Sequence, residues 1–166
     1  TKGDAGDETD IYYEIFQQLK EASITLPDQV VKLFQICNFP LVLTTSYAPR
    51  INEVLGVNEN NIKVYQKKKE SDILSINTGL KDSTILYHLF GKVNAVQKSF
   101  LVTDEDLLDY MHCWHNEGTR PVELAKYLKD KFFLVLGCNY PNWLFRFFWH
   151  SIKNFSITPT ADLGGM

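Results

Sequence analysis

The sequence FFLVLGCNYPNWLFRFFWHSI, residues 132–152, carries the pattern that decides the fold. It begins with five apolar residues, 132–136, which are typical of a strand that is buried on both faces of a parallel sheet. A turn that contains Gly137 follows, and Pro141 then opens a predicted helix over residues 142–153. A strand, a turn and a helix start in this order form ligand sites at the carboxyl edge of parallel sheets, where a helix start favours an anion such as phosphate. The stretch therefore predicts an α/β fold with a ligand at this edge.

Predicted helices and strands alternate through the rest of the chain. Residues 39–45 form a second short apolar run, and further strands are predicted over residues 61–66, 73–76 and 84–93. Apolar spacing and start signals predict helices over residues 11–21, 28–36, 49–55, 103–111 and 121–129. We expect a three-layer, Rossmann-like, mostly parallel sheet with helices on both faces. The two apolar runs, 39–45 and 132–136, should be neighbouring or near-neighbouring inner strands.

Composition predicts a soluble protein of the cytoplasm. The chain has 166 residues, of which 45% are hydrophobic and 13% aromatic, as in a packed domain. Its net charge of −3 argues against nucleic acid as a partner, and no apolar run approaches the roughly 20 residues that span a membrane. The three cysteines, Cys37, Cys113 and Cys138, are too widely spaced to indicate a disulfide framework.

Both ends of the chain differ in composition from its middle. Residues 1–10 are acidic, lack an initial methionine and are expected to be flexible, and residues 158–166 have the composition of a linker or tail. We therefore expect a domain over residues 11–157 that is part of a longer protein.

Several polar clusters have simpler explanations than catalysis. Thr103 precedes three acidic residues, 104–106, which is the pattern of a helix cap. His112 and His115 share a helix face, but Cys113 points about 100° away. A closed zinc site needs about four ligands, so no metal is predicted. Cys138 with a histidine as base would be a nucleophile, but a small cysteine near a turn is also common in packed structure.

Four segments taken in order resemble a known family. They are LVLTTSYAPRINEVLG (residues 41–56), ILYHLFGKV (85–93), FLVTDEDLLDYM (100–111) and the stretch 132–152. Together they resemble the sirtuin-like domains of bacteria, relatives of the silent-information-regulator NAD-dependent deacylases that often act as NAD-consuming effectors in anti-phage defence. The resemblance covers most of the chain, from residue 39 to 152, and implies a Rossmann-like fold with a site for NAD.

The resemblance also implies that the family's catalytic groups are changed in this chain. The family motif Thr-Thr-Asn-Tyr-Asp is similar to TTSYA, residues 44–48, so that its ribose-positioning asparagine is Ser46 and its aspartate is Ala48. The motif Leu-His-Gly, whose histidine is the catalytic base, is similar to LFG, with Phe90 in the histidine's place. A phenyl ring cannot accept a proton, so the general base is absent at that position.

Two possibilities remain open despite these changes: a catalytic base at a shifted position, and weak nucleotide binding. His88 lies two residues before Phe90, on the same face of a predicted strand, and is a candidate base whose reach differs by about 6–7 Å. The hydroxyl of Ser46 is still able to bond a ribose. Asn142 stands where an aspartate often follows the last nucleotide turn, and the family's first strand and Gly-Ala-Gly-x-Ser turn would lie before residue 11. The nucleotide-binding candidates are Thr44, Thr45, Ser46, Gly137, Cys138 and Asn139.

The predicted helix 142–153 is apolar on nearly every side, because large rings run from Trp143 to Trp149. We expect it to contact another domain of the same protein or a second subunit, unless the amino-terminal helices cover it. The leading functional hypothesis is a degenerate sirtuin-like module in a bacterial defence or signalling protein, acting in assembly or in sensing NAD or ADP-ribose. An active NAD hydrolase that uses His88 and Ser46 is one alternative, and a purely structural domain is another.

Overall fold

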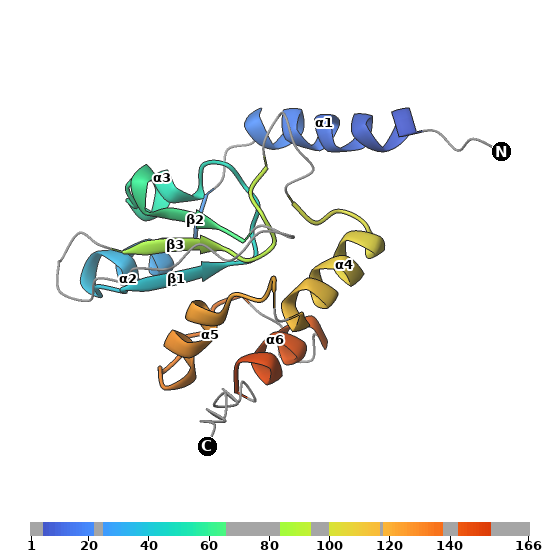
Figure 1. Ribbon diagram of the computed structural model, residues 1–166. Coiled ribbons are helices and arrows are strands. Elements are labelled where there is room, and N and C mark those ends of the chain that lie inside the picture. The colour runs from blue at the N-terminus through green and yellow to red at the C-terminus, as the bar shows by residue number, and fades with distance from the viewer. Residues whose placement is uncertain are drawn as a thin grey trace, which may run out of the picture. The chain divides into compact units, whose positions relative to one another are not determined.

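The computed structural model describes residues 5–21, 25–65, 84–93, 100–116, 118–137 and 143–153 (Figure 1). The chain divides into two compact units, Thr1–Arg120 and Pro121–Met166. The first unit contains, in chain order, α1 (Ala5–Glu21), α2 (Asp28–Ile36), β1 (Leu41–Thr44), α3 (Ile51–Leu55), η1 (Glu59–Asn61), β2 (Ile62–Val64), β3 (Ile85–His88) and α4 (Asp104–His115). The second contains α5 (Val122–Lys129) and α6 (Trp143–Lys153). None of the described helices is long and apolar enough to cross a membrane.

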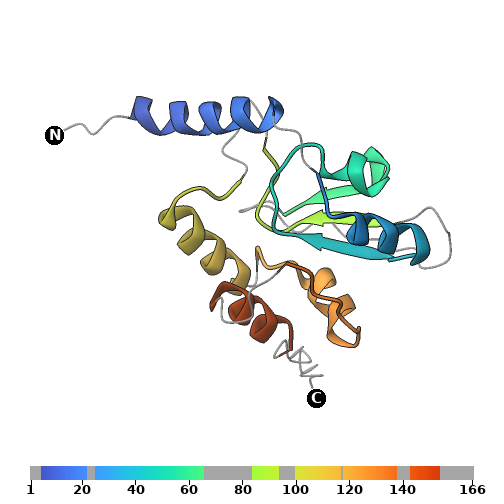
Figure 2. The ribbon, with the colours of Figure 1, turned by 180° about the vertical axis from the view of Figure 1, so that it is seen from behind.

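The three described strands form one parallel sheet in the order β1-β3-β2 (Figures 1 and 2). All four residues of the central strand β3 are buried, which explains its unbroken row of large side chains. Thr44 and Val64 are both register partners of His88. The three strands therefore end together, and the loops that follow them leave the same edge of the sheet.

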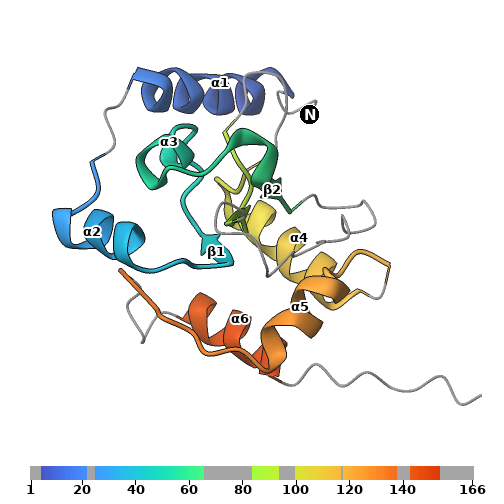
Figure 3. The ribbon, with the colours of Figure 1, turned by 90° about the vertical axis from the view of Figure 1, so that its left-hand side faces the viewer.

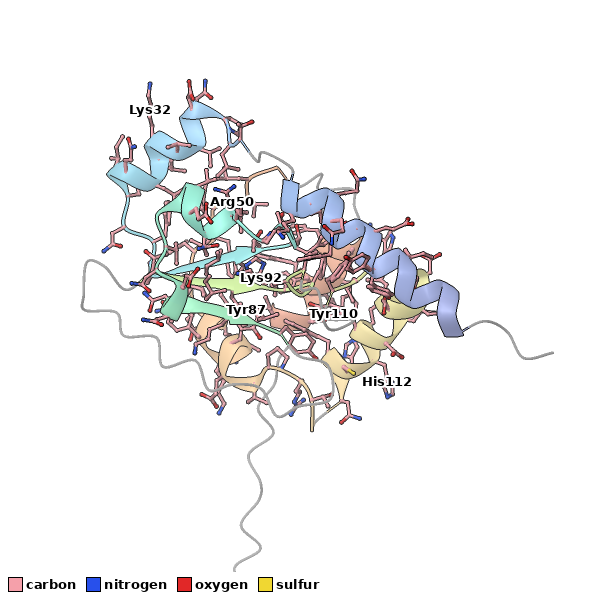
Figure 4. The ribbon with its side chains drawn as sticks, turned by 90° about the horizontal axis from the view of Figure 1, so that it is seen from above. Lys32, Arg50, Tyr87, Lys92, Tyr110 and His112 are labelled. Carbon is pink, nitrogen blue, oxygen red and sulfur yellow. The ribbon has the colours of Figure 1, made fainter. Side chains whose placement is uncertain are left out.

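Helices lie on both faces of this sheet. On one face, Leu86 of β3 forms a core cluster with Ile51 of α3 and with Val57. Tyr87 points to the opposite face, because neighbouring residues of a strand alternate. There its phenol group interacts with that of Tyr110 from α4; both residues are labelled in Figure 4. The expected Rossmann-like α/β fold is confirmed.

Helix α1 packs on a core cluster through its buried Tyr12 and through the partly buried Ile15, Phe16 and Leu19. Tyr12 is buried in a cluster with Val93 and Phe100, and its ring meets that of Phe100 edge-on at 5.3 Å between centroids. The helix begins at Ala5, earlier than the predicted start at Ile11, and so includes part of the acidic segment that was expected to be flexible. The prediction depended on apolar spacing, which a first helical turn does not require.

The amino end of α4 is closed by a capping box. The Thr103 hydroxyl oxygen accepts from the Asp106 backbone N–H at 3.1 Å, and the Asp106 carboxylate accepts from the Thr103 N–H, also at 3.1 Å. The same carboxylate accepts from the Val102 N–H at 3.0 Å and from the hydroxyl of Tyr12. Thr103 is thus the predicted cap, and Asp106 of the acidic run both completes the capping box and joins α4 to α1 through Tyr12.

Helix α2 spans Asp28–Ile36, as the sequence predicts, and leads into β1 (Figure 3). Its start is set by Pro27, whose φ of −55° suits the position before a helix. The ring of Phe34 in α2 packs against that of Phe39, which follows the helix, at 5.2 Å between centroids.

In the second unit, α5 and α6 contact each other, and α5 buries Leu124, Ala125 and Leu128. In α6, Ile152 is buried and Trp143 is 54% exposed. The predicted helices over residues 121–129 and 142–153 are therefore confirmed, each starting one residue later than expected.

The predicted inner strand over residues 132–136 is wrong. Residues 131–136 have no regular secondary structure, and Phe132, Leu134, Val135 and Leu136 are exposed. Only Phe133 is half-buried, with its ring 5.0 Å from that of Trp149. An apolar run shows which residues favour burial, but a strand also needs a neighbouring strand with which to share backbone hydrogen bonds. The described part of this unit contains no strand.

Candidate ligand site at the carboxyl edge of the sheet

The loops that follow β1 and β3 lie side by side. Thr44 ends β1 and His88 ends β3, and these two residues are register partners. In open parallel sheets, ligands bind outside the carboxyl ends of the strands. The loop 45–48 and the segment 89–93 are therefore the candidate site within the first unit.

Three hydrogen bonds hold these two segments together. The Leu89 N–H donates to the carbonyl oxygen of Thr44 at 2.9 Å, and the Val93 N–H donates to that of Tyr47 at 3.0 Å. Between them, Nδ1 of His88 lies 2.9 Å from the carbonyl oxygen of Ser46. The two loops thus form a single ordered surface.

The loop after β1 is also folded by its own side chains. The Thr44 hydroxyl oxygen accepts from the Ser46 N–H at 3.1 Å, and the Ser46 hydroxyl oxygen accepts from the Ala48 N–H at 3.3 Å. Both contacts are local turns in which a hydroxyl bonds the backbone two residues later. Thr45 is exposed and Ala48 is buried. The Ser46 hydroxyl keeps its own hydrogen, and so it still has a donor for a ligand.

Phe90 belongs to an aromatic cluster that is built around Tyr110 of α4. Its ring meets that of Tyr110 at 5.3 Å and 89°, and Tyr110 in turn packs against Tyr65 and Trp114. Burial raises the pKa of the Tyr110 hydroxyl, and the neighbouring phenol of Tyr65 adds to this effect. We call the four residues Tyr65, Phe90, Tyr110 and Trp114 the aromatic cluster. The position that carries Phe90 therefore sits among rings.

His88 and Phe90 do not share a face, in contrast to the prediction. Strand β3 ends at His88, and residues 89–90 form a turn, so the two-residue alternation stops before Phe90. The imidazole of His88 reaches the carbonyl of Ser46, whereas Phe90 packs on α4. The strand ends at His88, five residues before the predicted end at residue 93, and this is enough to separate them.

The imidazole of His88 is buried and neutral. The residue is 0% exposed, and burial lowers its pKa, an effect that the Ser46 carbonyl partly opposes and the charge of Lys92 reinforces. A carbonyl oxygen only accepts hydrogen bonds, so the ring's proton is on Nδ1. Nε2 is then an unprotonated acceptor, and it has no hydrogen-bond partner among the described residues.

The other predicted site residues are distributed over the two units. Gly137, in the second unit, has a φ of +69°, which favours glycine. Cys138, Asn139 and Asn142 lie outside the described residues. Across the described ranges, no group of three or more histidine, cysteine, aspartate or glutamate side chains is placed to hold a metal ion.

The aromatic cluster was missed from the sequence. Tyr110 and Trp114 are four apart on α4 and were a visible helical pair. Nothing local connects them to Tyr65, whose hydroxyl donates to the Thr119 carbonyl oxygen at 3.1 Å.

Comparison with known proteins identifies the family. No curated protein and no solved structure gives a significant match to the chain. The family model described as a SIR2-like domain matches residues 40–161, which is more than half of the 166 residues. The matched range includes the loop after β1, the end of β3 and helices α4 to α6. The chain belongs to the SIR2-like domain family.

Proposed function

We propose that this chain is a sirtuin-like module that binds NAD or ADP-ribose at the edge where β1 and β3 end, without cleaving it. The observation that carries the proposal is the environment of Phe90. Where the resemblance implies a catalytic histidine, a phenyl ring packs on Tyr110 in the aromatic cluster. A phenyl ring neither accepts nor donates a proton, so nicotinamide cleavage lacks its general base there. Binding without cleavage suits sensing or assembly in a larger bacterial defence or signalling protein.

Polar groups that suit a nucleotide remain at this edge. The SIR2-like family is NAD-related. Thr45 is exposed, and the Ser46 hydroxyl has a hydrogen to donate in place of the family's asparagine. The bonds between the two loops support binding because a preformed loop loses little conformational freedom when a ligand binds.

An NAD hydrolase that uses His88 as its base has less support. A general base must come within hydrogen-bonding distance of the proton that it takes, or reach it through one water. The His88 ring is fully buried, and its Nδ1 is engaged with the Ser46 carbonyl rather than with the Ser46 hydroxyl.

The test measures binding and cleavage on the same samples. We expect calorimetric titration with ADP-ribose to show binding, and chromatography after incubation with NAD to show nicotinamide only at the level of buffer. Ser46→Ala should weaken ADP-ribose binding about fivefold, which corresponds to one neutral hydrogen bond of about 1 kcal/mol. His112→Ala, at an exposed position of α4, is the control and should bind as the parent does.

Two results would contradict the proposal. One is the absence of binding by both nucleotides at millimolar concentration. The other is release of nicotinamide well above buffer that His88→Ala abolishes, which would establish the hydrolase instead.

The Phe90→His variant is expected to release no nicotinamide from NAD, because catalytic groups that act as a unit are not restored one at a time.

We further propose that α6 contacts another domain of the same protein or a second subunit. Trp143 is 54% exposed, and Phe132 and Leu134 in the same unit are 106% and 59% exposed. Tryptophan and phenylalanine commonly anchor interfaces, so these exposed side chains support a contact surface in this unit.

A further inference from the structure

We propose that His88 is a positioning residue that fixes the conformation of the Thr44–Ala48 loop through Nδ1, and so orients a backbone donor toward the nucleotide. The inference rests on the proposed function for its ligand but on the structure for its geometry. The imidazole of His88 is fully buried at the end of β3, and Nδ1 is 2.9 Å from the carbonyl oxygen of Ser46, a residue that lies 42 positions earlier in the chain. One side chain thereby joins the end of one strand to the middle of its neighbour's loop.

The bond determines which way one peptide group faces. The Ser46–Tyr47 peptide is trans, and in a planar trans peptide the carbonyl and the N–H point in opposite directions. Since the Ser46 carbonyl faces the imidazole, the Tyr47 N–H is turned away from the buried ring. No backbone carbonyl in the described part of the chain accepts a hydrogen bond from it. It is therefore oriented as a donor for an oxygen acceptor, which a phosphate or a ribose hydroxyl of ADP-ribose supplies.

The other bonds of the loop do not fix this peptide. The Leu89 N–H bonds the Thr44 carbonyl before it, and the Val93 N–H bonds the Tyr47 carbonyl after it. The hydroxyls of Thr44 and Ser46 accept from the N–H groups of Ser46 and Ala48, which also lie on either side. The Ser46 carbonyl is held by the imidazole, so losing the Nδ1 donor frees this one peptide to rotate.

Asparagine and glutamine separate positioning from packing at position 88. The asparagine amide nitrogen occupies nearly the place of Nδ1, whereas the glutamine amide lies farther out, near Nε2. His88→Asn therefore keeps the donor to the Ser46 carbonyl, and His88→Gln moves it away. Asparagine is also smaller, so His88→Asn leaves more empty volume and should lose at least as much stability as His88→Gln.

The two variants should therefore rank in opposite orders in two measurements. We expect His88→Asn to bind ADP-ribose within about twofold of the parent, and His88→Gln to bind about five- to tenfold more weakly, the effect of one lost hydrogen bond. In urea unfolding, His88→Asn should be the less stable variant or equal to His88→Gln. Binding that falls in step with stability in both variants would overturn the positioning role, because packing alone would then explain it.

A readout without ligand separates this inference from the proposed function. At neutral pH, nitrogen-15 spectra of the parent should show His88 protonated on Nδ1. The Tyr47 amide resonance should stay near its parent position in His88→Asn and move in His88→Gln, because only the second variant frees the peptide that carries it. Protonation on Nε2, or an equal change of this resonance in the two variants, would refute the positioning role whether or not ADP-ribose binds. If the spectra are as expected and the parent binds no nucleotide, the proposed function fails alone.

Discussion

At the scale of single residues, burial decides how His88 and Phe90 behave. His88 is a titratable group whose surroundings favour the neutral form, and Phe90 is a hydrocarbon ring among other rings. Neither environment is visible locally in the sequence, because the partners, Ser46 and Tyr110, are distant in the chain. The resemblance implies that Phe90 stands in the place of the family's catalytic histidine, but the contacts that surround Phe90 were not readable from the motif.

The burial of His88 makes a prediction about pH. Its pKa is lowered in the folded state, so the unfolded chain binds a proton first as the pH falls. Stability from this group is fully present above the ordinary histidine pKa and is lost as the pH falls below that value toward the lowered one. We expect the free energy of unfolding to decrease between about pH 7.5 and about pH 5.5 in urea titrations.

Substitution isolates the contribution of His88 from other titrating groups. His88→Asn should reduce the change in unfolding free energy over that pH range. An equal pH dependence in the parent and in His88→Asn would show that the imidazole titrates alike in the folded and unfolded chains.

At the scale of secondary structure, elements with local signals were predicted well. Helix α2 has its start set by Pro27, and α4 has its start set by Thr103, so both were readable from a few neighbouring residues. The strands β1 and β3 were found because both are continuous apolar runs. Residues 132–136 form a similar run but no strand, since strand formation depends on a partner that the run itself does not specify.

The capping box of α4 predicts a large effect of one carboxylate. Asp106 accepts from the N–H groups of Val102 and Thr103 and from the Tyr12 hydroxyl. Asp106→Ala removes these acceptors together and should lower the unfolding free energy by about 2–3 kcal/mol. Asp104→Ala, at an exposed position in the same first turn, should cost only about 0.3–1 kcal/mol through the helix dipole. Equal urea midpoints for the two variants would contradict this role of Asp106.

At the scale of the whole molecule, two units carry different parts of the family pattern. The loop after β1 and the end of β3 lie in Thr1–Arg120, whereas Gly137 and α6 lie in Pro121–Met166. The sequence predicted the α/β class, because the class follows from the order of helices and strands. It did not predict the division into units, which depends on where contacts are few.

The exposed apolar residues of the second unit predict association. We expect Trp143→Glu to fold as the parent does and to lower the mass in solution, measured by light scattering, if α6 contacts a second subunit. Ile36→Glu places the same charge on an apolar residue that is 82% exposed on α2, and should leave the mass unchanged. If the Trp143→Glu variant folds and keeps the parent's mass, α6 does not contact a second subunit. Only a contact with another domain of the same protein would then remain.

The strand order β1-β3-β2 has a consequence for synthesis on the ribosome. The central strand is the last of the three in the chain, and β1 and β2 share no hydrogen bonds with each other. The sheet formed by the three described strands therefore cannot assemble until His88 has left the exit tunnel, and until then β1 and β2 lack their common partner β3. Contacts between such distant segments form slowly, and unpaired strands are where nascent chains aggregate. The three described strands can therefore form their sheet only once β3 is available, with one strand docking on each side of it.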